Sequence, residues 1–249
     1  MQTTISTRAV VLNATAYGDS DLIVSLLTEE HGLVKGMAKG ARKSRKRFAG
    51  CFEPFTLIRV SARVKDPSML ARIESAEILD PRLKLREDLG RIEAGAMMLE
   101  LSAIFEEPGL GNMEVFELLN QSLKILESSS DILSLSSVFL VKLLTSAGYA
   151  VPVSECPGCG VDFAGRAGHY RGGHELVCEG CGKGSGESMK VSAGTLAFIR
   201  QAASMELEKV GRLRLLPSAR QEVFSFIGAY LEAVSGKRPK ALAKIASDA

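Results

Sequence analysis

Two pairs of cysteines, each with two residues between its members, constrain the fold of this 249-residue chain more than any other feature. Cys156-Pro-Gly-Cys159 and Cys178-Glu-Gly-Cys181 are separated by 18 residues, within the C-x2-C-x15–20-C-x2-C spacing of four-cysteine zinc sites. Each pair can turn both thiolates to one side of a tight loop, and two such loops complete the tetrahedron that zinc prefers. The spacing predicts a zinc-ribbon-like module at about residues 152–190 with these four cysteines as ligands.

Zinc bound at this site is expected to be structural, because four thiolates close the coordination shell and leave no position for an activated water. The segment from His169 to Val177 has the pattern of a hairpin, and we expect neither His169 nor His174 to bind the metal. Disulfides are disfavoured, since the start of the chain lacks a signal-peptide pattern and no apolar run approaches membrane-spanning length. The protein is therefore expected in the cytoplasm, with Cys51 as a small core residue.

A second feature is a local run of positive charge in a chain whose net charge is only +2. Between residues 35 and 47 there are seven cations and no acid, namely Lys35, Lys39, Arg42, Lys43, Arg45, Lys46 and Arg47. Gly36 and Gly40 loosen the segment so that it can follow a polyanion, and Phe48 offers a ring for base stacking. The run predicts a contact with nucleic-acid phosphates, and a solvated surface loop is the plainer alternative.

Up to about residue 80 the sequence has the pattern of short strands. Apolar and β-branched runs end at turn residues such as Gly18-Asp19 and Lys65-Asp66-Pro67-Ser68. Strands are predicted over residues 7–17, 22–28, 33–38, 55–64 and 69–78. Five strands with one cationic loop suit a small closed barrel, and an OB-fold is the leading candidate.

After Pro81 the apolar positions follow a helical period. Helices are predicted over residues 83–105, 115–126 and 132–147. A last helix is expected to follow Ser218 as its N-cap, with Gln221 completing a capping box, and to end before Gly236. The expected fold class is α+β in two domains: an OB-fold β-barrel over 1–80 that binds DNA, and an α-helical domain over 81–249 that carries the four-cysteine insert.

Motifs of common enzymes are absent from the sequence. It contains no P-loop, no G-x-G-x-x-G, no H-E-x-x-H and no G-x-S-x-G. Asp19 and Asp21, or Glu29 and Glu30, could be imagined as a carboxylate pair. Adjacent residues on a strand point to opposite faces, however, and acids beside Gly18 are more typical of a solvated turn. We therefore expect that the protein is not an enzyme.

Several short motifs resemble the RecO family of bacterial DNA repair proteins. They are Ala16-Tyr17-Gly18-Asp19-Ser20-Asp21, Thr28-Glu29-Glu30-His31-Gly32-Leu33, Lys39-Gly40-Ala41-Arg42-Lys43 and Phe52-Glu53-Pro54-Phe55. The helical section with its cysteine insert is similar in order and size to the zinc-bearing members, so the resemblance spans essentially the whole chain. It implies a recombination mediator that binds single- and double-stranded DNA through an N-terminal OB-fold and anneals complementary strands. With RecR, such proteins help load RecA onto DNA coated by single-stranded DNA-binding protein.

The resemblance also places the seven cations of residues 35–47 in the family's basic loop. It implies DNA, RecR and the tail of single-stranded DNA-binding protein as partners in a nucleoid-associated cytoplasmic protein, with RecF as a further candidate. A receptor for that acidic, apolar-tipped tail needs an apolar groove rimmed by cations. The C-terminal section offers candidates, for which ordinary packing is the alternative: Leu213, Leu215, Leu216, Arg212, Arg214 and Arg220.

Two other functions compete with recombination mediation. A single-strand or RNA-binding module with a zinc ribbon would prefer RNA or one strand and would not anneal. A protein-assembly scaffold, whose basic loop contacts an acidic protein, would bind nucleic acid weakly and with little dependence on salt. A strand-annealing assay separates the three.

Overall fold

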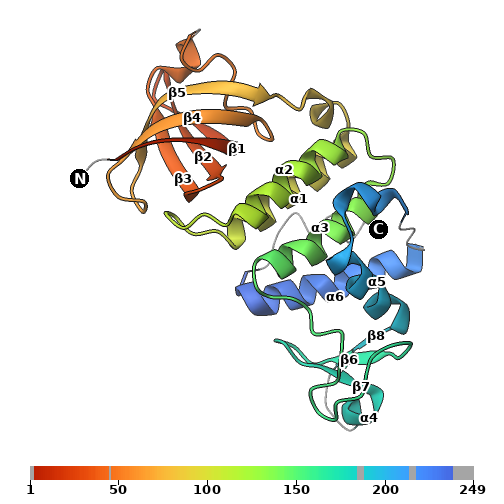
Figure 1. Ribbon diagram of the computed structural model, residues 1–249. Coiled ribbons are helices and arrows are strands. Elements are labelled where there is room, and N and C mark those ends of the chain that lie inside the picture. The colour runs from red at the N-terminus through yellow and green to blue at the C-terminus, as the bar shows by residue number, and fades with distance from the viewer. Residues whose placement is uncertain (1–2, 45, 184–187, 213–216, 238–249) are drawn as a thin grey trace. The chain divides into compact units, whose positions relative to one another are not determined.

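The fold is that of a computed structural model of residues 1–249, of which residues 3–44, 46–183, 188–212 and 217–237 are described (Figure 1). The chain divides into two compact units, Met1–Ser128 and Ser129–Ala249. The first unit holds a β-barrel and two α-helices, and the second holds further helices and a small three-stranded sheet. No helix within the described ranges is long and apolar enough to cross a membrane.

Five strands close into the barrel of the first unit in the order β1-β2-β3-β5-β4. They are β1 (Thr3–Tyr17), β2 (Asp21–Thr28), β3 (Gly32–Ala38), β4 (Leu57–Val64) and β5 (Ala71–Asp80). β1 pairs with both β2 and β4 in antiparallel fashion, and the parallel pairing of β3 with β5 closes the barrel. This is the strand order of an OB-fold, so the predicted fold class is confirmed.

Alternating residues of the strands fill the barrel, as the two-residue period of a strand requires. Ile5, Val24 and Val34 point inward from β1, β2 and β3 and are nearly or fully buried. The long connection between β3 and β4 contains the 3-10 helix η1 (Ala41–Lys43) and adds apolar side chains to the same core. Cys51 is among them at 3% exposure, which confirms its predicted place in the core.

Two helices belong to the barrel's unit, α1 (Leu89–Ile104) and α2 (Met113–Leu126), after the short 3-10 helix η2 (Leu83–Arg86). The single helix predicted over 83–105 is divided because Asp88 acts as an N-cap and accepts a 2.9 Å hydrogen bond from the Arg91 amide. Arg8 of β1 connects barrel and helices by ion pairs of 2.5 Å to Glu29 and to Glu117 of α2. The compact units thus divide after Ser128, whereas the predicted domain boundary at residue 80 marks the end of the barrel strands.

The second unit is built on three helices: α3 (Ile132–Ser146), α5 (Ala193–Ser204) and α6 (Pro217–Ser235). α6 begins at Pro217, so Ser218 lies in its first turn and the predicted N-cap is wrong. Proline suits that first position because its missing N–H would lack a helical partner there in any case. The predicted end of α6 is confirmed, since Gly236 follows Ser235 with a φ of 65°.

The remainder of the second unit is the cysteine module. Its sheet has the order β7-β6-β8, with β6 (Gly168–Tyr170), β7 (Leu176–Cys178) and β8 (Met189–Val191). The predicted hairpin is the antiparallel pair β6–β7, and β8 is a third strand that the sequence did not indicate. The short helix α4 (Glu179–Gly182) follows β7 directly, and the 3-10 helix η3 (Leu207–Arg212) lies between α5 and α6.

Candidate metal centre and nucleic-acid interface

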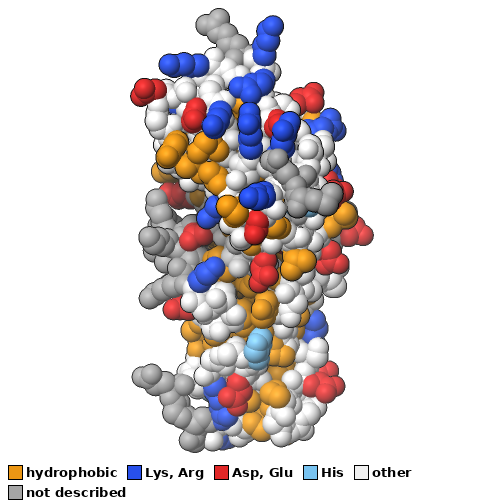
Figure 2. Space-filling view, turned by 90° about the vertical axis from the view of Figure 1, so that its left-hand side faces the viewer, with side chains coloured by type: hydrophobic (Ala, Val, Ile, Leu, Met, Phe, Trp, Pro, Cys, Tyr) orange, Lys and Arg blue, Asp and Glu red, His pale blue; other side chains and the backbone are white. Residues whose placement is uncertain are grey.

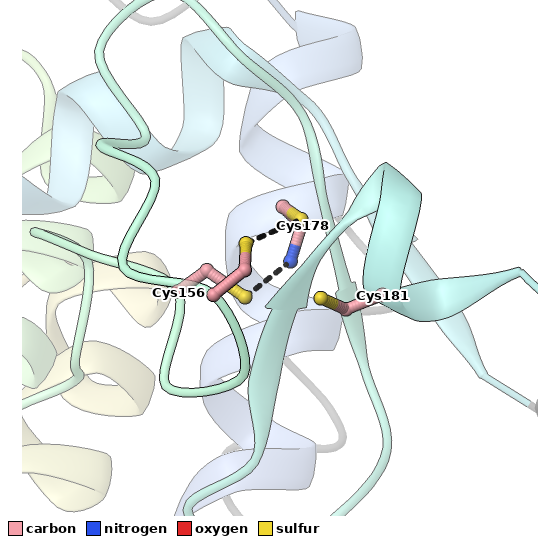
Figure 3. Close-up of side chains that lie close together, drawn as sticks. Cys156, Cys178 and Cys181 are labelled. Atoms are coloured by element: carbon pink, nitrogen blue, oxygen red, sulfur yellow. Dashed lines mark hydrogen bonds between the residues drawn. The ribbon is translucent and has the colours of Figure 1, made fainter.

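The four cysteines of the two pairs come together at one point. Cys156 and Cys159 lie on the loop before β6, Cys178 ends β7, and Cys181 lies on α4. Their sulfur atoms are all within 4.8 Å of one another, and Figure 3 shows the labelled side chains gathered around a common centre. Zinc bound to sulfur at 2.3 Å in a tetrahedron requires sulfur atoms about 3.8 Å apart. The donor set and its spacing therefore fit a four-coordinate metal ion.

Backbone amides prepare this cluster to carry negative charge. Burial raises the pKa of the Cys156 thiol, but hydrogen bonds from the amides of Cys178, Gly158 and Cys159 outweigh it and lower the pKa to about 6. The bond from the Cys178 amide to Cys156 Sγ measures 3.2 Å and is drawn in Figure 3. The neighbouring thiols raise the pKa of Cys181 to about 12. All four sulfurs can thus be thiolates together only if a cation offsets their repulsion.

Glycines in the loop of Cys156 and Cys159, called here the first knuckle, give the sulfur atoms room. A Cβ on Gly158 would lie 3.2 Å from Cys181 Sγ, and Gly160 adopts a φ of 72° that other residues rarely take. None of these cysteines forms a disulfide, and the Cys159 and Cys178 sulfur atoms, for example, are 3.6 Å apart, far from the 2.05 Å of a disulfide bond. The cysteines are therefore free thiols arranged for a metal.

The two histidines of the module make other contacts. His174 Nδ1 lies 2.8 Å from the Tyr230 hydroxyl of α6, and His169 Nδ1 lies 3.3 Å from Ser188 Oγ. Tyr170 of β6 also donates to a backbone carbonyl of α6, that of Ala229, at 3.4 Å. The contacts of His174 and Tyr170 join the module to α6.

The run of seven cations is divided among several elements. Lys35 lies on β3 with its side chain outside the barrel, and Arg42 and Lys43 lie on η1. Lys46 and Arg47 lie in the connection that leads to Phe48, and Arg45 lies outside the described residues. The predicted single basic loop is thus a strand followed by a structured connection.

The turn between β1 and β2 holds this connection in place. Asp21 Oδ1 accepts a 2.8 Å hydrogen bond from the Gly40 amide, and this bond lowers the pKa of the Asp21 carboxyl. The Arg42 amide donates to the Ser20 carbonyl at 3.0 Å. Part of the Ala16–Asp21 motif therefore supports the cationic segment, a role that the sequence did not reveal.

Most of the described cations in the run are available to a ligand. Among the described residues, Lys35, Lys39, Lys43 and Lys46 take part in no ion pair or side-chain hydrogen bond. Arg47 is engaged instead, because it donates to the Lys39 carbonyl at 3.0 Å and lies 5.0 Å from the centre of the Phe48 ring. Figure 2 shows Lys and Arg side chains gathered over the surface where the barrel lies.

The prediction that Phe48 stacks on a base is wrong. Phe48 is only 2% exposed and its ring packs 5.4 Å from that of Phe52 inside the barrel, so it cannot reach a base. Apolar residues beside a cationic run can belong to the core, and this one does. Tyr17, at the end of β1, is 55% exposed and lies beside the supporting turn. In the sequence Tyr17 stands out only as part of a motif, and its exposure makes it a candidate contact that the sequence did not reveal.

Most residues of the groove predicted near the C-terminal section lie outside the described residues. They are Leu213, Arg214, Leu215 and Leu216. Arg220 is engaged within the second unit, where it lies 3.2 Å from Asp131 at the start of α3. The tail receptor stays a prediction.

Comparison with known proteins gives a consistent result over both units. The family profile described as "Recombination protein O N terminal" matches residues 1–82, and "Recombination protein O C terminal" matches residues 86–243. "DNA repair protein RecO" of Syntrophobacter fumaroxidans is 33% identical over 225 residues, which cover 89% of this chain and 88% of the relative. The protein of the same name from Geobacter sulfurreducens is 35% identical over 180 residues, covering 72% and 73%. That from Bacillus pumilus is 28% identical over 232 residues, covering 93% and 90%.

The fold agrees with these matches, since a closed five-stranded OB-type barrel is followed by helices and a four-cysteine cluster. The matches together extend from residue 1 to residue 243. The chain belongs to the RecO family of DNA repair proteins.

Proposed function

We propose that this RecO-family chain is a recombination mediator without catalytic chemistry. It binds single- and double-stranded DNA through the barrel and anneals complementary strands. With RecR, it helps load RecA onto DNA that is coated by single-stranded DNA-binding protein, whose tail it contacts. RecF is a further candidate partner, and such a protein would work at the nucleoid.

The observation that carries this proposal is the set of unpaired cations at one end of the barrel. Lys39, Lys43 and Lys46 all lie in the connection after β3, and within the described part of the chain none of them forms an ion pair. Lysine ammonium groups reach phosphates without a fixed geometry, so they bind a polyanion without reading its sequence. A protein that serves repair at any locus needs contacts of this kind.

Annealing follows from the same charges. Two complementary strands repel one another through their phosphates, and a cationic surface that holds both lowers that repulsion. Because the contacts do not depend on sequence, base pairing alone decides which strands remain together. The proposed DNA contacts therefore suffice for strand annealing without hydrolysis of a nucleotide.

The test combines DNA affinity, salt and annealing. Lys39, Lys43 and Lys46 are changed together to Ala, and the matched control changes Lys84, Lys124 and Lys190, which are also exposed. Each phosphate contact with a single strand contributes about 0.7 to the slope of log affinity against log salt concentration. The first variant should therefore lose about two units of this slope, and the control variant should lose none. Annealing of complementary oligonucleotides should slow in the same variant.

The competing functions predict different results. An RNA-binding module would prefer RNA and leave annealing at the rate without protein. A scaffold would bind nucleic acid weakly with little effect of salt. If the two triple variants have equal affinity, salt slope and annealing rate, the segment between β3 and β4 that carries Lys39, Lys43 and Lys46, called here the cationic connection, is not part of the DNA site.

We further propose that the metal is zinc and that its role is structural. Four thiolates are the donor set of closed zinc sites, and the amide-to-sulfur bonds of the first knuckle match that use. Cys156, Cys159, Cys178 and Cys181 would hold the ion. Bound there, zinc would join the first knuckle to β7 and α4 and so keep the hairpin folded.

A further inference from the structure

The register of the barrel places one row of residues across its outer face. Thr15 lies opposite Ile23, Ile23 opposite Met37, and Met37 beside Arg72 of β5. Their neighbours along the strands, such as Val24, point into the core, so this row points outward. Ile23 and Met37 are partly exposed, and Arg72 is exposed.

Tyr17 continues this face at the end nearer the cationic connection. It is two residues beyond Thr15 on β1 and lies opposite Asp21. Asp21 in turn accepts from the Gly40 amide, and the charge of Lys39 helps to lower its pKa. Tyr17, 55% exposed, thus lies at the end of the outward-facing row, opposite the residue that holds the cationic connection.

Cations border the same face. Lys35 lies two residues before Met37 on β3, and Arg72 lies beside Met37 on β5. Neither takes part in an ion pair among the described residues. Arg63 of β4, which lies opposite Arg72, is held instead by a 2.6 Å ion pair with Glu74. Free cations therefore lie next to the apolar row, and the paired one lies beyond it.

An aromatic ring, a partly apolar floor and free cations form the combination that single-stranded nucleic acid requires. Every base has a flat face that can stack on an aromatic ring, whatever its identity. Stacking needs an unpaired base, because the bases of a duplex are already stacked on one another. Phosphates meanwhile need cations spaced along the path of the strand.

We propose that Tyr17 stacks on an unpaired base and that Arg72, with Lys35, holds the adjoining phosphates on the outer face of β1-β2-β3-β5. This inference rests on the proposed function and adds a base contact and a further phosphate contact to it. The cationic connection binds both forms of DNA, whereas this face distinguishes single strands from duplex. Tyr17 is the residue that carries the distinction.

The experiment uses the full chain and three ligands of equal length: an oligothymidine, the same strand with abasic sites, and a duplex. The abasic strand keeps every phosphate but offers no ring to stack on. The parent should bind oligothymidine on the order of tenfold more tightly than the abasic strand. Tyr17→Ala should lose most of this preference, and Tyr17→Phe should keep it because the ring remains.

Arg72 is tested by its salt dependence. Arg72→Gln should lower the log–log slope for oligothymidine by about 0.7, the value of one phosphate contact. Arg63→Gln is the matched control and should leave the slope unchanged, because that side chain is engaged by Glu74. Thermal unfolding of each variant shows whether the exposed substitutions have kept the fold.

The results distinguish this inference from the proposed function. If the parent binds DNA with a steep salt dependence, but Tyr17→Ala keeps the full preference for oligothymidine over the abasic strand, the base contact is overturned and the mediator function stands. If Arg72→Gln and Arg63→Gln have the slope of the parent, the strand does not cross β5. If even the parent shows no salt-dependent binding, the proposed function itself fails.

Discussion

Two buried charged residues of the first unit show what single side chains contribute. Arg82 is 1% exposed, and burial lowers the pKa of its guanidinium to about 10. It donates to the carbonyls of Phe55 at 3.0 Å and Asn120 at 3.2 Å, and so joins the end of the barrel to α2.

Glu106, in the connection between α1 and α2, is 5% exposed and accepts from the Asn112 amide at 3.3 Å. Its second carboxylate oxygen has no hydrogen-bond partner among the described residues.

Glu106 should make stability depend on pH. Burial raises its pKa from 4.5 to about 7, so between these values the folded state binds the proton more tightly than the unfolded state does. Its contribution to the free energy of unfolding is therefore present at low pH and lost as pH rises from about 4.5 to about 7. Glu106→Gln should stabilise the protein by ~1–3 kcal/mol at pH 8 and change it little at pH 4.5.

Urea denaturation at the two pH values measures this difference. Glu107→Gln is the control, because that neighbouring side chain is exposed and should show no such dependence. A gain for Glu106→Gln that is equal at both pH values would contradict a buried, protonated carboxyl.

At the scale of elements, the connection between α1 and α2 packs against the turn between β2 and β3. Gly32 and Pro108 form an antiparallel bridge, and the Gly109 amide donates to the His31 carbonyl at 3.0 Å. Gly32 has a φ of 59°, and a Cβ there would lie 2.6 Å from the Leu110 carbonyl oxygen and closer still to that of Glu107. Glycine at this position lets a loop of the helical hairpin contact the barrel directly.

A matched pair of glycines tests this contact. Gly18 has the same φ of 59°, but a Cβ added there would have no atom within 4 Å, so Gly18→Ala should cost only the backbone strain of about 1 kcal/mol. Gly32→Ala adds a collision with two backbone carbonyls and should cost ~3 kcal/mol or more in the free energy of unfolding. Chemical denaturation measures both, and equal costs would show that the two connections separate easily.

Elements were predictable from the sequence where a local pattern decides them. The alternation of strands and the turn at Gly18-Asp19 located β1 and β2, and cysteine spacing located the metal-binding cluster. Features that depend on distant residues were not predictable. Asp88 divides a periodic apolar run because its side chain caps a new helix, and Phe48 is buried because the barrel provides a place for its ring. Tyr17 was overlooked for the same reason, since its exposure follows from the closed barrel.

At the scale of the whole molecule, the chain combines two compact units, each with its own core. The barrel unit carries the proposed DNA contacts, and the second unit carries the cysteine cluster. Contacts such as that between His174 and Tyr230 connect the cluster to α6. Loss of the metal should therefore affect the second unit first.

The double substitution Cys156→Ser with Cys159→Ser tests this division. It removes two of four ligands, so metal content by elemental analysis should fall from about one zinc per chain to near zero. The melting temperature of the second unit should fall, while the barrel should keep its salt-dependent DNA binding at low temperature. A parent protein purified without chelator that contains no metal would exclude the zinc proposal, and parallel loss of DNA binding would contradict the independence of the two units.

The parallel seam between β3 and β5 has a consequence for how quickly the barrel forms. Only three residue pairs make this seam, from Gly36 with Ala71 to Ala38 with Ile73. The chain between the two strands comprises the long connection after β3 and all of β4. The entropy of closing so large a loop must be overcome before these few contacts form, whereas the β1–β2 and β2–β3 hairpins close locally. We expect the hairpins to assemble early and the seam to close last, so that barrel closure limits the folding rate. The outer face of β1-β2-β3-β5, on which we place the single strand, would then exist only after this final step.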